Sequence, residues 1–332
     1  MNLDNQVIFL KNSLREKQNS VTSMSTSGRQ SLRSLFVFGL HICFSIWLTA
    51  CGNVELDSQT PPAAGPPQIS ADTSKPVIYF GVISRYNPRI MFEEYQPIMD
   101  YLSAETDFRF ELKLGKSYED AVEFLCSGEV TIASLGGLTY LQTHDLCNAV
   151  PILRPLNKEG KPSYHSVIVV RKDSPIRTLT ELRGHSFAFA SAHSTSGNLM
   201  PRYVLAEAGI SLTELSRYQN LKHHDDVARA VIRGDFEAGA LKDIIAYRYL
   251  DKGLRIIHIS QPIPSVPLVV RPDCDPQLVE AVKQALLKID PRKPGQSARL
   301  ALWNEEFRYG FTEASDSDYD VLRAIRQGTN IP

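Results

Sequence analysis

Three consecutive hydroxyl side chains, Ser194, Thr195 and Ser196, are the residues of this sequence best suited to binding chemistry. They follow an apolar segment (SFAFA) that predicts a strand, and they begin a segment with helical spacing. The first N–H groups of a helix have no acceptor within it, and the helix dipole makes this end positive. Such a turn can bind a small oxyanion, for example phosphate, phosphite, phosphonate or sulfate. Ordinary N-capping is the alternative, but a run of three hydroxyls followed by Gly197 favours the oxyanion.

Two further groups of polar residues could contribute to the same site, at 223–226 (HHDD) and at 242–243 (KD). His224 can donate to an oxyanion, although His223 and His224 can also merely cap the helix that begins there. Asp243 follows an apolar strand pattern (EAGAL), and ligands approach the carboxyl ends of such strands. Its carboxylate either accepts from a protonated oxyanion, pairs with a ligand amine, or caps the next helix.

Strand and helix patterns alternate from residue 76 onward, which indicates βαβ units and the α/β fold class. Strands are predicted at 77–82, 108–114, 130–134, 149–154, 164–170, 186–190, 217–220, 238–241, 254–257 and 267–270. Helices are predicted at 93–104, 118–126, 138–146, 179–183, 196–208, 225–233, 244–250 and 276–289. We therefore expect mainly parallel sheets flanked by helices.

The alternating segments form two similar series, which predicts two lobes with the second inserted into the first. Lobe 1 would comprise residues 76–168 and 268–332, and lobe 2 residues 169–267. The chain would cross over near 168–171 and return near 267–271. Two crossings leave a cleft between the lobes, where ligands bind and around which hinges close.

The N-terminal part predicts export. Residues 35–47 (LFVFGLHICFSIW) form an apolar run after Arg29 and Arg33, as in a secretory signal, and the run is shorter than the about 20 residues that span a bilayer. The following LTAC, ending at Cys51, resembles the bacterial lipobox, where the chain is cut before an acylated cysteine. We expect a signal peptide at 1–50, lipidation of Cys51 and a flexible linker at 51–75. An uncleaved anchor helix is the alternative.

Composition excludes several other classes of protein. The net charge is −1, and removal of residues 1–50 makes the chain slightly more acidic, whereas a nucleic-acid binder shows a basic stripe. No Cys/His spacing suggests zinc, so we expect no metal and no cofactor. Cys126 and Cys147 are the favoured disulfide pair, because each lies near the end of a predicted helix; three buried free thiols, with Cys274, are the alternative. We expect the protein to act as a monomer.

Taken together, these segments resemble the substrate-binding proteins of phosphate, phosphite and phosphonate ABC transporters, the PhnD-like group. STSG at 194–197, followed by Pro201, resembles the family's anion-binding segment. GVISRY at 81–86, with Pro97, looks like its opening strand, loop and helix, and LGGLTY at 135–140 looks like its second loop. Residues 223–243 look like its histidine-led helix and following strand. The similarity covers about 76–289 and implies a type II periplasmic-binding-protein fold.

The resemblance also implies a site and a function. The family pattern, transferred residue by residue, implies that seven side chains contact the ligand: Ser194, Thr195, Ser196, His224, Asp243 and the phenol hydroxyls of Tyr86 and Tyr140. At Val266 the family often has a polar or acidic residue, and this departure favours a compact anion over one with an amine. The implied function is capture of a phosphorus oxyanion outside the cytoplasm, at a bacterial membrane, and its delivery to an ABC-transporter permease.

Two other functions are alternatives to transport. A receptor of the same fold that reports to a signalling partner would carry the same cleft. An enzyme using Ser194 or Ser196 as nucleophile would need an oriented base, and a phosphatase usually needs metal ligands. The HHDD cluster supplies suitable atoms, but consecutive residues at a helix start point in different directions. Because no GxSxG, HExxH or P-loop motif is present, we expect no catalytic residues.

Overall fold

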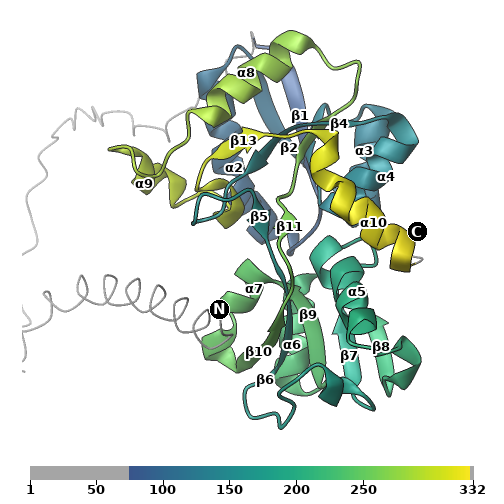
Figure 1. Ribbon diagram of the computed structural model, residues 1–332. Helices are drawn as coiled ribbons and strands as arrows, with labels where there is room; N and C mark the ends of the chain where they lie inside the picture. Colours follow the sequence, from purple (N-terminus) through teal and green to yellow (C-terminus); the bar gives the residue numbers. More distant parts are fainter. Residues whose placement is uncertain (1–74, 330–332) are drawn as a thin grey trace, which may run out of the picture. The chain divides into compact units, whose positions relative to one another are not determined.

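The computed structural model describes residues 75–329, which form two lobes, each built on one sheet (Figure 1). The predicted signal peptide, Cys51 and all of the predicted linker except Lys75 lie outside the described residues. Within 75–329, none of the helices combines the length and the apolar character needed to cross a membrane.

The first lobe contains a six-stranded sheet in the order β13-β4-β12-β3-β1-β2. Its strands are β1 (Val77–Val82), β2 (Arg109–Leu114), β3 (Ile132–Ser134), β4 (Val150–Pro155), β12 (Leu268–Val270) and β13 (Phe311–Glu313). Its helices are α2 (Pro88–Glu105), α3 (Tyr118–Ser127), α4 (Gly137–Cys147), α8 (Pro276–Leu287), α9 (Gln296–Leu300) and α10 (Asp320–Thr329). Strand β1 pairs in parallel with β2 and β3, whereas β12 runs antiparallel to β3 and β4.

The second lobe contains a five-stranded sheet in the order β10-β6-β9-β7-β8. Its strands are β6 (Ser166–Arg171), β7 (Ser186–Phe189), β8 (Arg217–Asn220), β9 (Ala238–Lys242) and β10 (Leu254–Ile259). Its helices are α5 (Met200–Glu207), α6 (His224–Arg233) and α7 (Asp243–Tyr247). Strand β6 alternates between two cores, with Ile168 and Val170 in one and Val167 and Val169 in the other. Both faces of this sheet are therefore covered.

The chain passes between the lobes through a pair of short antiparallel strands, β5 (Ser163–Tyr164) and β11 (Ile263–Pro264). This corrects the predicted first crossing, because β6 belongs to the second sheet from Ser166 and not only after residue 168. Both sheets are also mixed: β6 and β12, the strands that carry the chain into and out of the second lobe, run antiparallel to their neighbours. The α/β class and the two-lobed architecture are confirmed.

Several element boundaries differ from the predictions for local reasons. Helix α2 begins at Pro88, five residues before the predicted start at 93. Asn87 caps it, because its side chain accepts from the N–H of Ile90 at 3.2 Å. The apolar spacing on which the prediction rested begins only after this first turn. The segment predicted as one helix at 196–208 is a π-helical turn, Thr195–Leu199, followed by α5. The C-terminal elements α9, β13 and α10 were not predicted.

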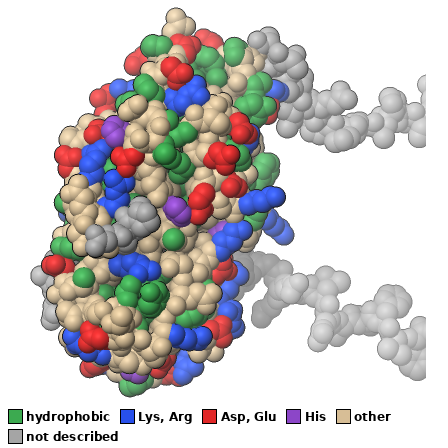
Figure 2. All heavy atoms as spheres, turned by 90° about the vertical axis from the view of Figure 1, so that its right-hand side faces the viewer, with side chains coloured by type: hydrophobic (Ala, Val, Ile, Leu, Met, Phe, Trp, Pro, Cys, Tyr) green, Lys and Arg blue, Asp and Glu red, His purple; other side chains and the backbone are tan. Residues whose placement is uncertain are grey.

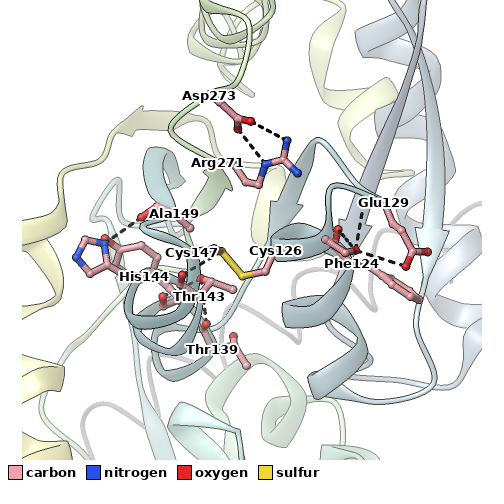
Figure 3. Close-up of a disulfide and its surroundings, with 12 residues drawn as sticks. Phe124, Cys126, Glu129, Thr139, Thr143, His144, Cys147, Ala149, Arg271 and Asp273 are labelled. Carbon is pink, nitrogen blue, oxygen red and sulfur yellow. Dashed lines mark hydrogen bonds and ion pairs between the residues drawn. A yellow bond between two sulfur atoms is a disulfide. The ribbon is translucent and has the colours of Figure 1, made fainter.

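A disulfide joins Cys126 in α3 to Cys147 at the end of α4, so the favoured pairing is confirmed (Figure 3). Cys274 is a partly buried free thiol. The bond ties together two helices whose other ends carry Tyr118 and the N–H of Leu138, which both contribute to the interlobe site described below.

Figure 2 shows the face of the protein that lies on the right-hand side of Figure 1. Basic and acidic side chains are interspersed over it, so this face offers no continuous basic surface of the kind that nucleic acids require.

Candidate functional site

The three hydroxyl residues Ser194, Thr195 and Ser196, called here the hydroxyl run, lie between β7 and α5, and each is only 2% exposed. Gly197 makes their position possible. A Cβ atom at Gly197 would lie 2.3 Å from the Cβ of Ala190 and 2.9 Å from Cε1 of His224, so any larger residue would displace the turn. The predicted helix-start location is confirmed, with a π-helical first turn.

Ser194 is held in one orientation by two donors. The Nδ1 atom of His224 accepts from the N–H of Lys242 at 3.2 Å, so the ring proton is on Nε2, which lies 3.2 Å from the Ser194 oxygen. That oxygen also accepts from the N–H of Gly197 at 3.0 Å. With both acceptor positions used, the Ser194 hydroxyl proton points to a third group. His224 therefore positions Ser194, and both of its own ring nitrogens are occupied.

His224 is held in its neutral form by its surroundings. Burial, with the nearby charges of Lys242 and Arg85, lowers the pKa of His224 to about 3. A neutral ring with a fixed tautomer is what the Ser194 contact requires.

Thr195 connects the two lobes. Its hydroxyl oxygen accepts from the N–H of Leu138, in the first turn of α4, at 2.8 Å. The hydroxyl proton remains available for donation, because the oxygen acts as the acceptor in this bond. The N–H groups of Thr195 and Ser196 lie in the first turn, where no intrahelical acceptor exists.

Two buried phenols complete the hydroxyl surface. Tyr118, at the start of α3, interacts with Ser194, and burial raises the pKa of Tyr118 to about 12. Tyr164, in the interlobe strand β5, interacts with Thr195 and Ser196, and burial raises its pKa as well. Both phenols therefore stay protonated at neutral pH and can donate hydrogen bonds.

A buried group of charges, called here the charged triad, lies beside the hydroxyl run and consists of Arg85, Lys242 and Glu306. Arg85 follows β1 in the first lobe, Lys242 ends β9 in the second, and Glu306 belongs to the C-terminal part of the first. The Glu306 carboxylate accepts from both Arg85 and Lys242. The triad therefore spans the lobes, and its two basic side chains share one carboxylate.

Arg85 has a guanidinium nitrogen without a partner. One NH2 group donates to Glu306 and, at 3.0 Å, to the Tyr95 hydroxyl, but the other has no hydrogen-bond partner within residues 75–329 although Arg85 is 2% exposed. Burial is the main cause of the raised pKa values of Tyr118 and Tyr164 and of the lowered pKa values of His224 and Lys242. The Arg85 charge is close enough to oppose the first two shifts and to add to the last two. An unpaired donor in a buried site costs free energy, and an anion would satisfy it.

Three residues predicted for the site have other contacts. Asp243 accepts at one oxygen from the N–H of His165 and at the other from its neighbour Ile244, both at 2.8 Å, so it holds the backbone at the start of α7. Tyr140 donates to Asp316 and packs on Tyr319, with ring centroids 4.8 Å apart. The guanidinium carbon of Arg248 lies over the ring of Tyr86, 5.4 Å from the centroid of that ring.

Arg85, Tyr118, Tyr164, Lys242 and Glu306 were not predicted. Lys242 could have been found from its position, since it ends a strand that is buried at every residue, and a lysine there needs a partner. Arg85 lies in the GVISRY segment at 81–86, but only Tyr86 of that segment was predicted for the site. Glu306 could not have been found, because no local pattern links residue 306 to residue 85.

Further contacts across the cleft show that the lobes are closed on each other. His223 donates from Nδ1 to the carbonyl oxygen of Ser84 at 2.9 Å, and Arg248 pairs with Glu94 at 3.3 Å. Within the described part of the chain, no group of three or more His, Cys, Asp or Glu residues could hold a metal ion. The arrangement therefore offers neutral and cationic hydrogen-bond donors to a small anion.

A protein-family model matches residues 80–319, and its description is ABC transporter, phosphonate, periplasmic substrate-binding protein. Among curated proteins, the chain is similar to the phosphate-import protein PhnD of Mycolicibacterium smegmatis, with 24% identity over 85% of this chain and 92% of that protein. It is also similar to the phosphonates-binding periplasmic protein of Escherichia coli, at 27% identity. That alignment spans 46% of this chain and 47% of the relative, so just under half of each.

The fold is also found among solved structures. PhnD1 of Prochlorococcus marinus, solved in complex with methylphosphonate, superposes with a TM-score of 0.70 at 22% identity, covering 77% of this chain and 99% of that one. At this identity the likeness concerns the fold: mixed sheets in two lobes around a cleft, the type II periplasmic-binding-protein architecture.

Proposed function

Because the chain belongs to the family of periplasmic substrate-binding proteins of phosphonate ABC transporters, we propose that it binds a small phosphorus oxyanion between its lobes and delivers it to a permease. The family consists of extracytoplasmic transport components and not of enzymes. The observation that carries the ligand proposal is the buried guanidinium nitrogen of Arg85 beside the hydroxyl run, which has no partner among residues 75–329.

The donors match the needs of such an anion. The hydroxyl run and the first-turn N–H groups supply neutral donors, and Arg85 supplies a charged one, which together replace the hydration shell of the oxyanion. The buried, protonated phenols of Tyr118 and Tyr164, which interact with the hydroxyl run, would add two further neutral donors. The proposed ligand contacts are Arg85, Tyr118, Tyr164, Ser194, Thr195 and Ser196.

The remaining predicted residues take supporting roles in this proposal. His224 orients the Ser194 hydroxyl, and Asp243 holds the strand end from which Lys242 projects. Tyr86 and Tyr140 stabilise the cleft walls through Arg248 and Asp316. The ligand would then stabilise the closed form, because its contacts come from both lobes.

A lipid anchor on Cys51 completes the proposal. Lipidation and a linker at 51–75 would keep the receptor close to its permease and raise its effective concentration there. Labelling of the protein with a tagged fatty acid in a bacterial host would test this. Label should be incorporated by the native chain and lost in Cys51→Ala, and label retained in that variant would contradict the anchor.

Calorimetry tests the ligand. The mature chain, residues 51–332 with Cys51→Ala, would be titrated with phosphate, phosphite, methylphosphonate and sulfate. We expect one-to-one binding of at least one phosphorus oxyanion with a dissociation constant of micromolar or below. Heat with none of them would contradict the proposed function, and heat with sulfate alone would move the ligand to sulfur oxyanions.

A further inference from the structure

The two carboxylates closest to the hydroxyl run already have protein partners on both of their oxygens. Glu306 forms ion pairs with both Arg85 and Lys242. Asp243, the other buried carboxylate at this end of β9, accepts from two backbone N–H groups, those of His165 and Ile244. Within residues 75–329, neither group has an oxygen left without such a contact.

The amino group of Lys242 lies at the edge of the same site. Burial and the Arg85 charge lower its pKa, and its contact with the Glu306 carboxylate favours the ammonium form. Lys242 is 2% exposed, and its Nζ atom is 3.9 Å from the centroid of the Tyr164 ring, whose hydroxyl interacts with Thr195 and Ser196. The backbone N–H of Lys242 also bonds His224, the residue that orients Ser194. A ligand held by the hydroxyl run would thus have Lys242 and Arg85 as its charged neighbours.

We propose that Lys242 is a specificity-determining residue that makes the site reject phosphorus oxyanions carrying an ammonium group. This inference rests on the proposed function and specifies its substrate class: phosphate, phosphite or a short alkylphosphonate without an amine. A ligand ammonium would be buried among two like charges, which disfavours it. It could pair with Glu306 only by displacing Arg85 and Lys242, and two buried cations would then lose their partner. Asp243 is already held by two backbone N–H groups.

A matched pair of ligands tests this directly. Methylphosphonate and aminomethylphosphonate differ by one ammonium group, and the native mature chain should bind the first at least about 100-fold more tightly in calorimetry. In Lys242→Met, which keeps the length of the side chain and removes its charge, the ratio should fall below about tenfold. Lys172→Met, at an exposed position of the second lobe, should keep the native ratio.

The outcomes are distinguishable from failure of the proposed function. Binding of no phosphorus oxyanion at all would contradict the proposed function itself. Equal affinity of the native chain for the two phosphonates would overturn the role of Lys242, even if the variant does not fold. An unchanged ratio in a folded Lys242→Met, or binding of phosphate but of neither phosphonate, would also overturn it, because the discrimination would then come from shape.

Discussion

At the scale of single residues, Arg85 is the side chain on which the proposed ligand contact depends most. It is fixed by Tyr95 and Glu306, so its remaining nitrogen is held in place before a ligand arrives. Arg85→Met should weaken oxyanion binding by about 10- to 150-fold, because one charge-assisted hydrogen bond contributes about 1.5–3 kcal/mol. Calorimetry measures the change. Arg89→Met is the matched control, since the Arg89 side chain is 86% exposed on the adjoining helix and should leave affinity unchanged.

His224 makes a prediction about pH. Its pKa is about 3 in the folded protein and about 6.5 in an unfolded chain, so the unfolded state binds more protons between these values. The stability that neutral His224 provides is therefore complete above pH about 6.5 and is lost as the pH falls towards 3. Denaturant unfolding from pH 7 to 4 should show a steeper loss in the native chain than in His224→Gln. If the free energy of unfolding falls with pH equally in the native chain and in His224→Gln, the assignment of a neutral buried His224 ring is contradicted.

Residue chemistry also explains where sequence interpretation succeeded and failed. The hydroxyl run was predictable because a helix start is a local pattern. His224 followed from the family resemblance and stands one residue before the helix predicted at 225–233. Asp243 was predicted for the site because it follows a strand, but the direction of its side chain at the junction of β9 and α7 cannot be read from composition. The resemblance placed Tyr140 on the ligand, and its observed partner, Asp316, could not be predicted because it is 176 residues away in the chain.

At the scale of elements, the contact between α4 and the C-terminal segment distinguishes the structure from the sequence-based interpretation. Tyr140→Phe should change ligand affinity by less than about threefold, because the hydroxyl serves Asp316. The free energy of unfolding should fall by about 1 kcal/mol, the usual contribution of a hydrogen bond. Tyr164→Phe is the contrasting variant and should weaken binding. A large loss of ligand affinity in Tyr140→Phe would indicate that the Tyr140 hydroxyl contacts the ligand.

The bond between Cys126 and Cys147 stabilises the pair α3 and α4, which present Tyr118 and the N–H of Leu138 to the second lobe. It closes a loop of sequence separation 21, for which the expected stabilisation is about 3 kcal/mol. The double substitution Cys126→Ser with Cys147→Ser should lower the free energy of unfolding by that order in urea titrations. Ligand affinity should stay within a few-fold of native, and unaltered stability would show that packing alone holds the two helices.

At the scale of the whole described molecule, the lobes are held together by contacts that a ligand would reinforce. Helix α10 extends from the first lobe and contacts α5 of the second (Figure 1), while the charged triad and the Thr195–Leu138 bond cross the cleft. The two-lobed architecture was predictable because strand and helix alternation repeats twice. The closing contacts were not, because they join residues far apart in the sequence.

The most direct measurement of the central claim is a crystal structure of the mature chain with bound methylphosphonate. We predict phosphonate oxygens within hydrogen-bond distance of the hydroxyls of Ser194, Thr195 and Ser196, and of the guanidinium nitrogen of Arg85 that has no partner among the described residues. A ligand bound at another place in the protein, or one in this cleft that leaves Arg85 and the hydroxyl run without contact, would contradict the account.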